Sequence, residues 1–307
     1  MSLGRILYKL YYKPVGNVRH ILKTGIMRTW KQNKGRREMK TASEHIRELH
    51  FEEKETFQIY FLTGKKYWYQ TAFCLYSLQK HAKINIKATI VDDGSFDEEL
   101  ESQVKKQFPS SEVIREATIE TLLDNILPES RYPNIRKRRI EYPHLRKLTD
   151  VHVLTGKDWK IVLDSDMLFF NPPQDILEWY RKPEKMLFMA DIEESYGYPI
   201  SYLQSLAGTN DFPSKLNVGI TGIPSSSIDW DKMEFWIGDS IDKYGKSYLQ
   251  EQGLTAALAA RHGYLLLPEE SYKVMPIVSQ NYPPEILHHY VADSKFDYFV
   301  KGWKKVL

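Results

Sequence analysis

Strand-like and helix-like segments alternate along most of this chain, and the alternation limits the fold more than any other feature of the sequence. The strand candidates are short apolar runs. The helix candidates carry apolar residues three or four positions apart, as Trp230, Met233, Ile237 and Ile241 do. Helical crossovers of this kind connect parallel strands and cover both faces of their sheet. We therefore expect an α/β fold with a mostly parallel central sheet and helices on both faces.

The limits of these runs set the expected elements. Strands are expected at residues 56–63, 86–93, 112–116, 160–170, 185–192, 216–223 and 264–268. Helices are expected at residues 67–82, 97–107, 118–127, 143–155, 230–244 and 250–261. The basic run from Arg136 to Arg139 is expected to be a solvated loop. Ligands of such sheets bind beyond the carboxyl ends of the strands, so we expect the functional site at that edge.

The strand expected at 160–170 carries two aspartates one residue apart, in the sequence KIVLDSDMLFF. Side chains alternate along a strand, so Asp164 and Asp166 are expected on one side and Ser165 on the other. Carboxylates beside this much apolar bulk are costly to desolvate unless a cation neutralises them. A surface turn is the alternative. We predict a divalent metal site.

A second Asp-x-Asp, formed by Asp229 and Asp231, has the same spacing in a different setting. It follows three serines and opens the helix expected at 230–244. An aspartate at that position caps free backbone amides and interacts favourably with the helix dipole. We interpret this copy as a helix start.

Charge is unevenly distributed along the 307 residues, whose formal net charge is +3. Residues 1–40 hold 11 Lys and Arg against one Glu, about +10, which leaves about −7 for residues 41–307. Leu, Ile, Tyr, Met and Trp are interleaved with these cations. That composition suits a helical, amphipathic arm on an anionic membrane surface. The alternative is a solvated arm that packs on the domain or on another chain.

Cysteine content and hydropathy indicate the cellular compartment in which the protein works. The one cysteine, Cys74, excludes an intrachain disulfide and suits a reducing compartment. No apolar run approaches the roughly 18–20 residues that span a bilayer, and no signal-peptide apolar block is present. We expect a cytoplasmic protein, peripheral at the inner membrane face through residues 1–40, with no nucleic acid among its partners.

Polar residues elsewhere could meet a ligand. Tyr67, Asp92 and Asp93 follow the first two strands and could stack on and hydrogen-bond a nucleotide base, or simply form a turn. Arg146, beside Lys147, precedes the aspartate strand and could meet an anion.

The later segments add further candidates. Asn217 and Gly219 interrupt an apolar strand, which suggests close approach of backbone and ligand, or else a β-bulge. Glu251 and Gln252 open a helix. A histidine of the pair at 288 and 289, joined to the two aspartates, would suit Mn²⁺.

In order and spacing these segments resemble the metal-dependent nucleotide-sugar glycosyltransferases with a single Rossmann-like domain, most closely the retaining family 8 enzymes, over roughly residues 57–303. The matching pieces are YPHLRKL before LDSDML, then LNVGI, EQG, and HYVADSK followed by GW. Three positions depart from the family pattern. Thr63-Gly64-Lys65 stands where an Asp is usual, Glu251 replaces an Asp, and Ala292 replaces a Gly.

The resemblance implies a nucleotide-diphospho-sugar transferase fold at residues 56–307, after a connector at 41–55. It implies transfer of a hexosyl unit, from a UDP-sugar, to a glycan or lipid-linked glycan with retention, as in cell-surface polysaccharide synthesis. Asp164, Asp166 and His289 would hold Mn²⁺ or Mg²⁺. The implied catalytic residues are Glu251, Gln252, Lys295 and Arg146. The implied donor contacts are Tyr67, Asp92, Asp93, Arg146, Ser165, Asn217, Gly219 and Lys295.

Two other functions fit parts of the sequence. In a phosphatase of the haloacid dehalogenase type Asp164 would be the nucleophile, and GDSID at 238–242 would be a later acidic motif. A catalytically silent glycan-binding relative would keep the fold and lose the metal.

Overall fold

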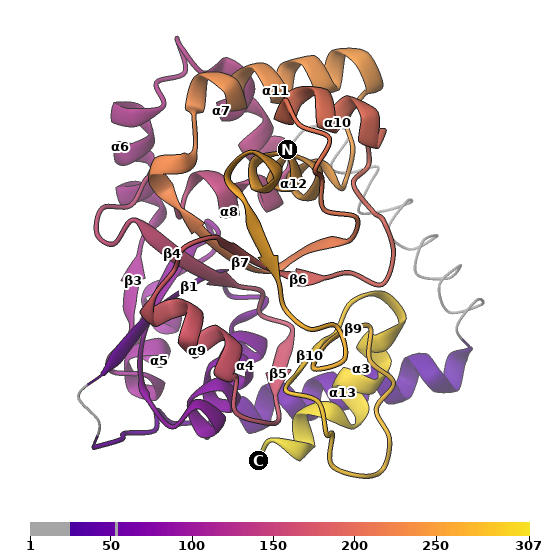
Figure 1. The fold of residues 1–307 in the computed structure, drawn as a ribbon. Helices are drawn as coiled ribbons and strands as arrows, with labels where there is room; N and C mark the ends of the chain where they lie inside the picture. Colours follow the sequence, from indigo (N-terminus) through magenta and orange to yellow (C-terminus); the bar gives the residue numbers. More distant parts are fainter. Residues whose placement is uncertain (1–24, 53–54) are drawn as a thin grey trace.

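The computed structural model describes residues 25–52 and 55–307 (Figure 1). Seven strands form the main sheet in the order β3-β2-β1-β4-β7-β6-β8. They are β1 (Thr56–Thr63), β2 (Asn85–Asp92), β3 (Glu112–Ile114), β4 (Trp159–Leu163), β6 (Met186–Ala190), β7 (Leu216–Pro224) and β8 (Tyr264–Leu266). A smaller sheet holds β5 (Met167–Phe169), β10 (Leu287–His289) and β9 (Tyr272–Val274).

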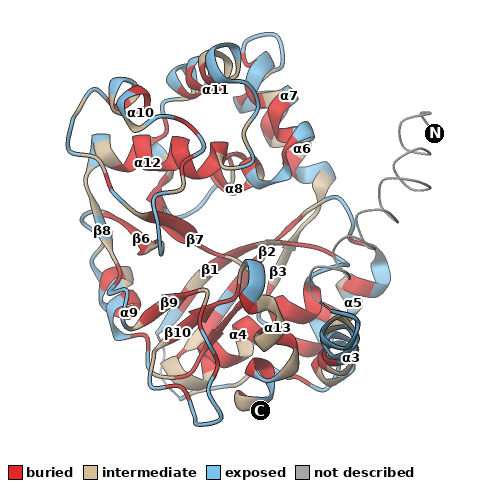
Figure 2. Ribbon diagram, turned by 90° about the vertical axis from the view of Figure 1, so that its right-hand side faces the viewer, coloured by how far each residue is buried: buried red, intermediate tan, exposed pale blue. Residues whose placement is uncertain are grey.

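Helices cover both faces of the main sheet, so the expected α/β fold class is confirmed (Figure 2). They are α3 (Ile26–Ser43), α4 (Trp68–Ala82), α5 (Glu98–Gln107), α6 (Glu116–Ile126), α7 (Pro133–Glu141), α8 (Arg146–Thr149), α9 (Gln174–Arg181), α10 (Ile200–Ala207), α11 (Trp230–Tyr244), α12 (Gln250–His262) and α13 (Lys295–Val300). Strand β1 shows that both faces of the sheet are buried. Ile59 and Phe61 enter one hydrophobic core, and Tyr60 between them enters the other.

The main sheet is mixed rather than wholly parallel. Strands β1, β2, β3 and β4 pair in parallel, as do β6 and β8, but β7 runs antiparallel to both β4 and β6. The reversal brings the first residues of β7 to the edge where β4 and β6 end. Asn217 and Gly219 of β7 therefore lie at the carboxyl edge of the parallel strands.

The strand expected at 160–170 is divided in two, which corrects one step of the sequence argument. Strand β4 ends at Leu163, and β5 begins only at Met167, because the chain leaves the main sheet to pair with β10. The backbone N–H of Asp164 still bonds the carbonyl of Gly219 at 2.8 Å. The two aspartates are therefore in a turn between two sheets, and not in one extended strand.

The basic run at Arg136–Arg139 is also not the solvated loop that was expected. It lies on helix α7, and Arg138 and Arg139 are both buried. Arg139 donates to Asp150 Oδ2 at 2.7 Å and to Glu120 Oε1 at 2.7 Å. Neighbouring carboxylates thus make burial of this guanidinium possible.

Helix α3 lies against the domain, beside α13 and α4 (Figure 1). Gly35 approaches the backbone carbonyl of Phe299 so closely that a Cβ would collide with it, and Met39 is fully buried. The expected arm at 1–40 falls partly on this helix and partly on residues 1–24, which lie outside the described residues. No helix in the described part of the chain is long and apolar enough to cross a membrane.

Candidate functional site

Three metal-ligating side chains meet at the carboxyl edge of the main sheet. Asp164 and Asp166 come from the turn after β4, and His289 comes from the end of β10. One ligand atom of each lies within 4.8 Å of the others. His289 Nε2 is 3.3 Å from Asp166 Oδ1 and 3.7 Å from Asp164 Oδ2. The structure thus brings together the three residues for which the sequence suggests a metal.

The imidazole of His289 is free to coordinate a metal. Its side chain is buried, yet neither ring nitrogen has a hydrogen-bond partner among residues 25–52 and 55–307. Buried polar nitrogens are rarely left without a partner, and imidazole is a common ligand of divalent metals. The neighbouring His288 is already satisfied, by Glu285 at 3.1 Å and Tyr290 at 3.0 Å. This favours His289 as the ligand.

Lys295, at the start of α13, adds a cation to the cluster, because its Nζ donates a hydrogen bond to Asp166 Oδ2. Burial alone would raise the pKa of Asp166, but Lys295 and His289 lower that pKa below its ordinary value. Asp166 is therefore ionised at neutral pH. Two carboxylates and an imidazole form a suitable donor set for Mn²⁺ or Mg²⁺, so the residues present fit such an ion.

Lys147, and not Arg146, reaches the site from helix α8. Its Nζ is 3.2 Å from Asp164 Oδ1, 3.0 Å from the carbonyl of Val218 and 3.6 Å from Glu251 Oε1. Burial lowers the pKa of Lys147, but Asp164 and Glu251 together raise it above its ordinary value. Arg146 turns toward Glu116 instead, at 3.4 Å.

Glu251 opens helix α12 and is almost fully buried, with 3% of its surface exposed. Its Oε1 has no hydrogen-bond partner among the described residues. Burial raises the pKa of Glu251 to about 7, and the nearby charge of Lys147 limits that rise. A carboxyl group that titrates near neutral pH is typical of functional sites.

Asn217 and Gln252 share a partner that the sequence argument did not single out. Both amides donate to Asp191 Oδ2, Asn217 at 2.9 Å and Gln252 at 3.3 Å. Asp191 directly follows β6, so its place at the end of a strand beside β7 is the signal that could have revealed it. Asn217 also accepts from the N–H of Gly219 at 2.9 Å, which orders this stretch of β7.

The remaining donor-binding candidates lie around the first two strands. Tyr67 is 41% exposed just before α4, and Ser165 shares a hydrogen bond with Thr71 at 2.8 Å. Asp92 is buried, and its carboxylate accepts the backbone N–H groups of residues 94, 95 and 96, so it holds the turn together. Asp93 lies in that turn and accepts from Ser95.

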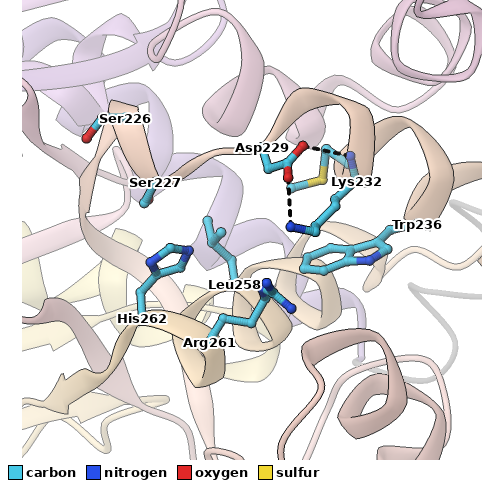
Figure 3. A pocket seen from close by; sticks show the side chains of 9 residues that line it. Ser226, Ser227, Asp229, Lys232, Trp236, Leu258, Arg261 and His262 are labelled. Atoms are coloured by element: carbon cyan, nitrogen blue, oxygen red, sulfur yellow. Dashed lines mark hydrogen bonds and ion pairs between the residues drawn. The ribbon is translucent and has the colours of Figure 1, made fainter.

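A separate cavity of about 220 Å³ lies at the opposite edge of the sheet, beyond the end of β7 (Figure 3). Asp229 stands there as the cap of α11, accepting from the N–H of Lys232 at 3.0 Å and pairing with its Nζ at 2.8 Å. The interpretation of this Asp-x-Asp as a helix start is confirmed. The later acidic motif at 238–242 lies within α11, where Asp239 accepts from Tyr202 and Lys243.

The fold is of the GT-A type, the nucleotide-diphospho-sugar transferase fold. No protein-family model matches the sequence, and no curated protein matches it either. The apo crystal structure of mouse xyloside xylosyltransferase 1 matches with a TM-score of 0.52 at 13% identity, over 76% of this chain and 97% of that one. An active-site mutant of LgtC matches with a TM-score of 0.51 at 15% identity, over 82% and 100%.

A third match is the bifunctional glycosyltransferase WbbM, with a TM-score of 0.50 at 12% identity. It covers 83% of this chain and 50% of WbbM, so the similarity spans half of that protein. At these identities the matches show the fold alone. The resemblance inferred from the sequence is therefore confirmed at the level of the fold.

Proposed function

We propose that this protein is a metal-dependent glycosyltransferase that transfers a hexosyl unit from a UDP-sugar to a glycan or lipid-linked glycan. The observation that carries the proposal is the cluster of Asp164, Asp166 and His289 with Lys295 beside it. The cluster lies at the carboxyl edge of the main sheet, in a fold similar to that of a xylosyltransferase. In doubly wound sheets this edge is where ligands bind.

The charges of the cluster suit a nucleotide diphosphate. Asp164, Asp166 and His289 would hold Mn²⁺ or Mg²⁺, which when bound supplies a Lewis acid for the departing diphosphate. Lys295 presents its ammonium group beside Asp166, where negative charge develops on the leaving group. We place Arg146 in the same role through the resemblance, although its side chain turns toward Glu116 in the structure.

The sugar would lie over the polar residues between β6, β7 and α12. Asn217 and Gln252 are held in fixed orientations by their shared partner Asp191, so their remaining polar atoms could meet sugar hydroxyls. We keep Gly219 among the donor contacts through the resemblance, although the His289 ring lies directly over it in the structure. In a retaining reaction the acceptor attacks from the face that the diphosphate leaves, and we assign Glu251 or Gln252 to the position beside the anomeric carbon.

For the nucleotide we propose the surface around the first two strands. The half-exposed ring of Tyr67 can stack on a base, and Asp93 and Ser165 lie in the adjoining loops. Asp92 supports this surface by ordering the turn that carries Asp93.

We also propose that the enzyme works at the cytoplasmic face of a membrane, in cell-surface polysaccharide synthesis. The support is the sequence of residues 1–40, which carries about ten excess positive charges with aromatic residues among them.

A panel of nucleotide sugars, assayed for slow donor hydrolysis with and without Mn²⁺, tests the proposal. We expect release of a nucleoside diphosphate that needs the metal. Asp166→Asn should abolish it without unfolding the protein, because the change removes a metal-binding charge and keeps the volume. The matched control is Asp229→Asn, which has the same chemistry in the other Asp-x-Asp and should retain activity, since asparagine also caps helices well.

Two results would overturn the proposal. Metal-dependent cleavage of simple phosphate monoesters that is lost in Asp164→Asn would support the phosphatase. Binding of a glycan with no metal-dependent turnover of any donor would support a catalytically silent relative.

A further inference from the structure

A cavity of about 520 Å³ opens beside Lys295, between helix α3, the loop that follows β1 and the start of α13. Six cationic side chains line it, and no carboxylate does among the residues described. They are Arg36, Arg37, Lys40, Lys65, Lys66 and Lys295. The cavity therefore adjoins the candidate site at Lys295.

Helix α3 is a fixed wall of this cavity. Close contact of Gly35 with the backbone of Phe299 and burial of Met39 hold the helix against α13. The guanidinium of Arg36 lies 4.6 Å from the centre of the Phe299 ring. Arg36 and Lys40 are four residues apart, so they share one face of the helix.

Four of the six cations have no ion pair with a carboxylate of the described residues. Lys65 pairs with Asp97, and Lys295 pairs with Asp166. Arg36, Arg37, Lys40 and Lys66 form no ion pair with a carboxylate in residues 25–52 or 55–307, and Lys66 donates instead to the Tyr67 hydroxyl at 2.8 Å. Like charges four residues apart destabilise a helix, and a cavity with one sign of charge concentrates counter-ions. An anion in the cavity would relieve this repulsion.

We propose that the cavity binds a phosphate group carried by the acceptor. The inference rests on the proposed function, in which the metal site and Lys295 already meet the diphosphate of the donor. The cations of α3 line the same cavity but contact none of Asp164, Asp166 and His289, so they serve a second anionic group next to the reaction centre. Arginine recognises phosphate through paired hydrogen bonds, and two of the four cations without an ion pair are arginines.

Tyr67, whose ring we propose to stack on the donor base, also lines the cavity, so donor and acceptor would lie side by side. The phosphate can belong to a soluble sugar phosphate or to a lipid-linked acceptor. Both sources present the same group to α3, and the test separates them.

The test uses the full chain with Mn²⁺ and UDP, which occupy the donor side. Binding of glucose 1-phosphate is measured by calorimetry, with glucose as the uncharged comparison. The variant Arg37→Gln/Lys40→Gln should weaken glucose 1-phosphate binding by about tenfold or more, because it removes two charge-assisted contacts. The control Lys31→Gln/Lys34→Gln removes the same charge from α3 outside the cavity and should bind as the wild type does.

Vesicles containing phosphatidic acid, compared with phosphatidylcholine alone, form the second arm. A lipid source requires that the cavity variant bind these vesicles more weakly than the control variant does, whereas a soluble source requires that difference with glucose 1-phosphate. Arg37 and Lys40 are exposed, so both double variants should melt as the wild type does.

Three results would overturn the inference. The first is no saturable binding of glucose 1-phosphate or phosphatidic acid vesicles to any variant. The second is equal weakening in the cavity and control variants. The third is a loss of UDP affinity in the cavity variant, which would assign the cations to the donor. Failure of the wild type to bind UDP contradicts the proposed function instead, and glucose 1-phosphate binding measured without UDP still decides whether the cavity takes a phosphate.

Discussion

Gly219 and His289 are in such close contact that a Cβ atom on residue 219 would lie 2.5 Å from the His289 ring. Real Cβ atoms do not approach so closely, so the glycine makes the position of the imidazole possible. In the sequence Gly219 suggested close approach of a ligand to the backbone. The structure shows that a side chain of the protein itself uses part of that space.

Gly219→Ala should therefore displace the His289 ring and weaken Mn²⁺ binding by about tenfold to a hundredfold, the range for disturbing the orientation of a metal ligand. A Mn²⁺ titration followed by calorimetry measures the affinity, and metal-dependent donor hydrolysis should fall with it. The control is Gly222→Ala on the same strand, where the added Cβ would meet Trp179 and Leu187. That variant should lose stability but keep its metal affinity, and equal affinities in all three proteins would contradict the prediction.

Much of the fold could be predicted because its elements have strong local patterns. All seven strands of the main sheet coincide with expected runs, since buried strands are apolar throughout. Strand β5 was expected only as the end of one strand at 160–170, and β9 and β10 were not expected. Each has three residues, and pairs such as Phe169 with Leu287 join residues far apart in the chain. Helix α7 was missed because Arg139 looks solvated until its distant partners are known.

The candidate site could be predicted only in part from the sequence. Asp164, Asp166 and His289 belong to recognisable short motifs, and the structure brings them together. The choice between Arg146 and Lys147 depends on the orientation of one short helix, which no local pattern determines. Asp191 has no motif of its own, and only the position of its strand in the sheet gives it a role.

The buried carboxyl group of Glu251 should make stability depend on pH. Its pKa is about 7 in the folded protein and about 4.5 in the unfolded chain, so between these values the folded state binds more protons. Stability from this group is complete below pH 4.5 and is lost as the pH rises through 7. Glu251→Gln removes the titrating carboxyl group. As the pH rises from 4.5 to 7, the melting temperature of the wild type should therefore fall relative to that of the variant.

Thermal melts of both proteins at matched ionic strength, from pH 4.5 to 8, measure the difference. The groups around Glu251 are Lys147 on α8, Asp164 after β4 and Tyr142 before α8, and all three are present in both proteins. Parallel melting curves across the window would show that Glu251 is ionised throughout, and the raised pKa would be wrong.

The ion pair of Arg139 and Asp150 should contribute strongly to stability. Asp150 is fully buried and Arg139 is 2% exposed, so removing the aspartate leaves a buried cation whose one remaining ion-pair partner among the described residues is Glu120. Asp150→Ala should lower the free energy of unfolding by about 3 kcal/mol or more. Asp231→Ala breaks the exposed pair with Arg131 and should change stability little, since water screens such pairs. Urea unfolding of both variants measures this, and similar losses would contradict the assignment.

The last prediction concerns residues 1–24, which precede helix α3. Deletion of residues 1–40 would remove most of helix α3, which packs on α13, and so could not separate membrane binding from folding. Deletion of 1–24 leaves the helix in place and removes Arg5, Lys9, Lys13, Arg19 and Lys23.

Each such cation near an anionic surface contributes about 1 kcal/mol. The deletion should therefore weaken binding to anionic vesicles by orders of magnitude at low salt. Donor hydrolysis should be unchanged, because every predicted site residue follows residue 63. Vesicle co-sedimentation of both proteins measures the binding, and a variant with the five cations changed to Gln separates charge from apolar burial. If the full chain ignores anionic vesicles at low salt, or binds them equally well without residues 1–24, the segment has no membrane role of this kind.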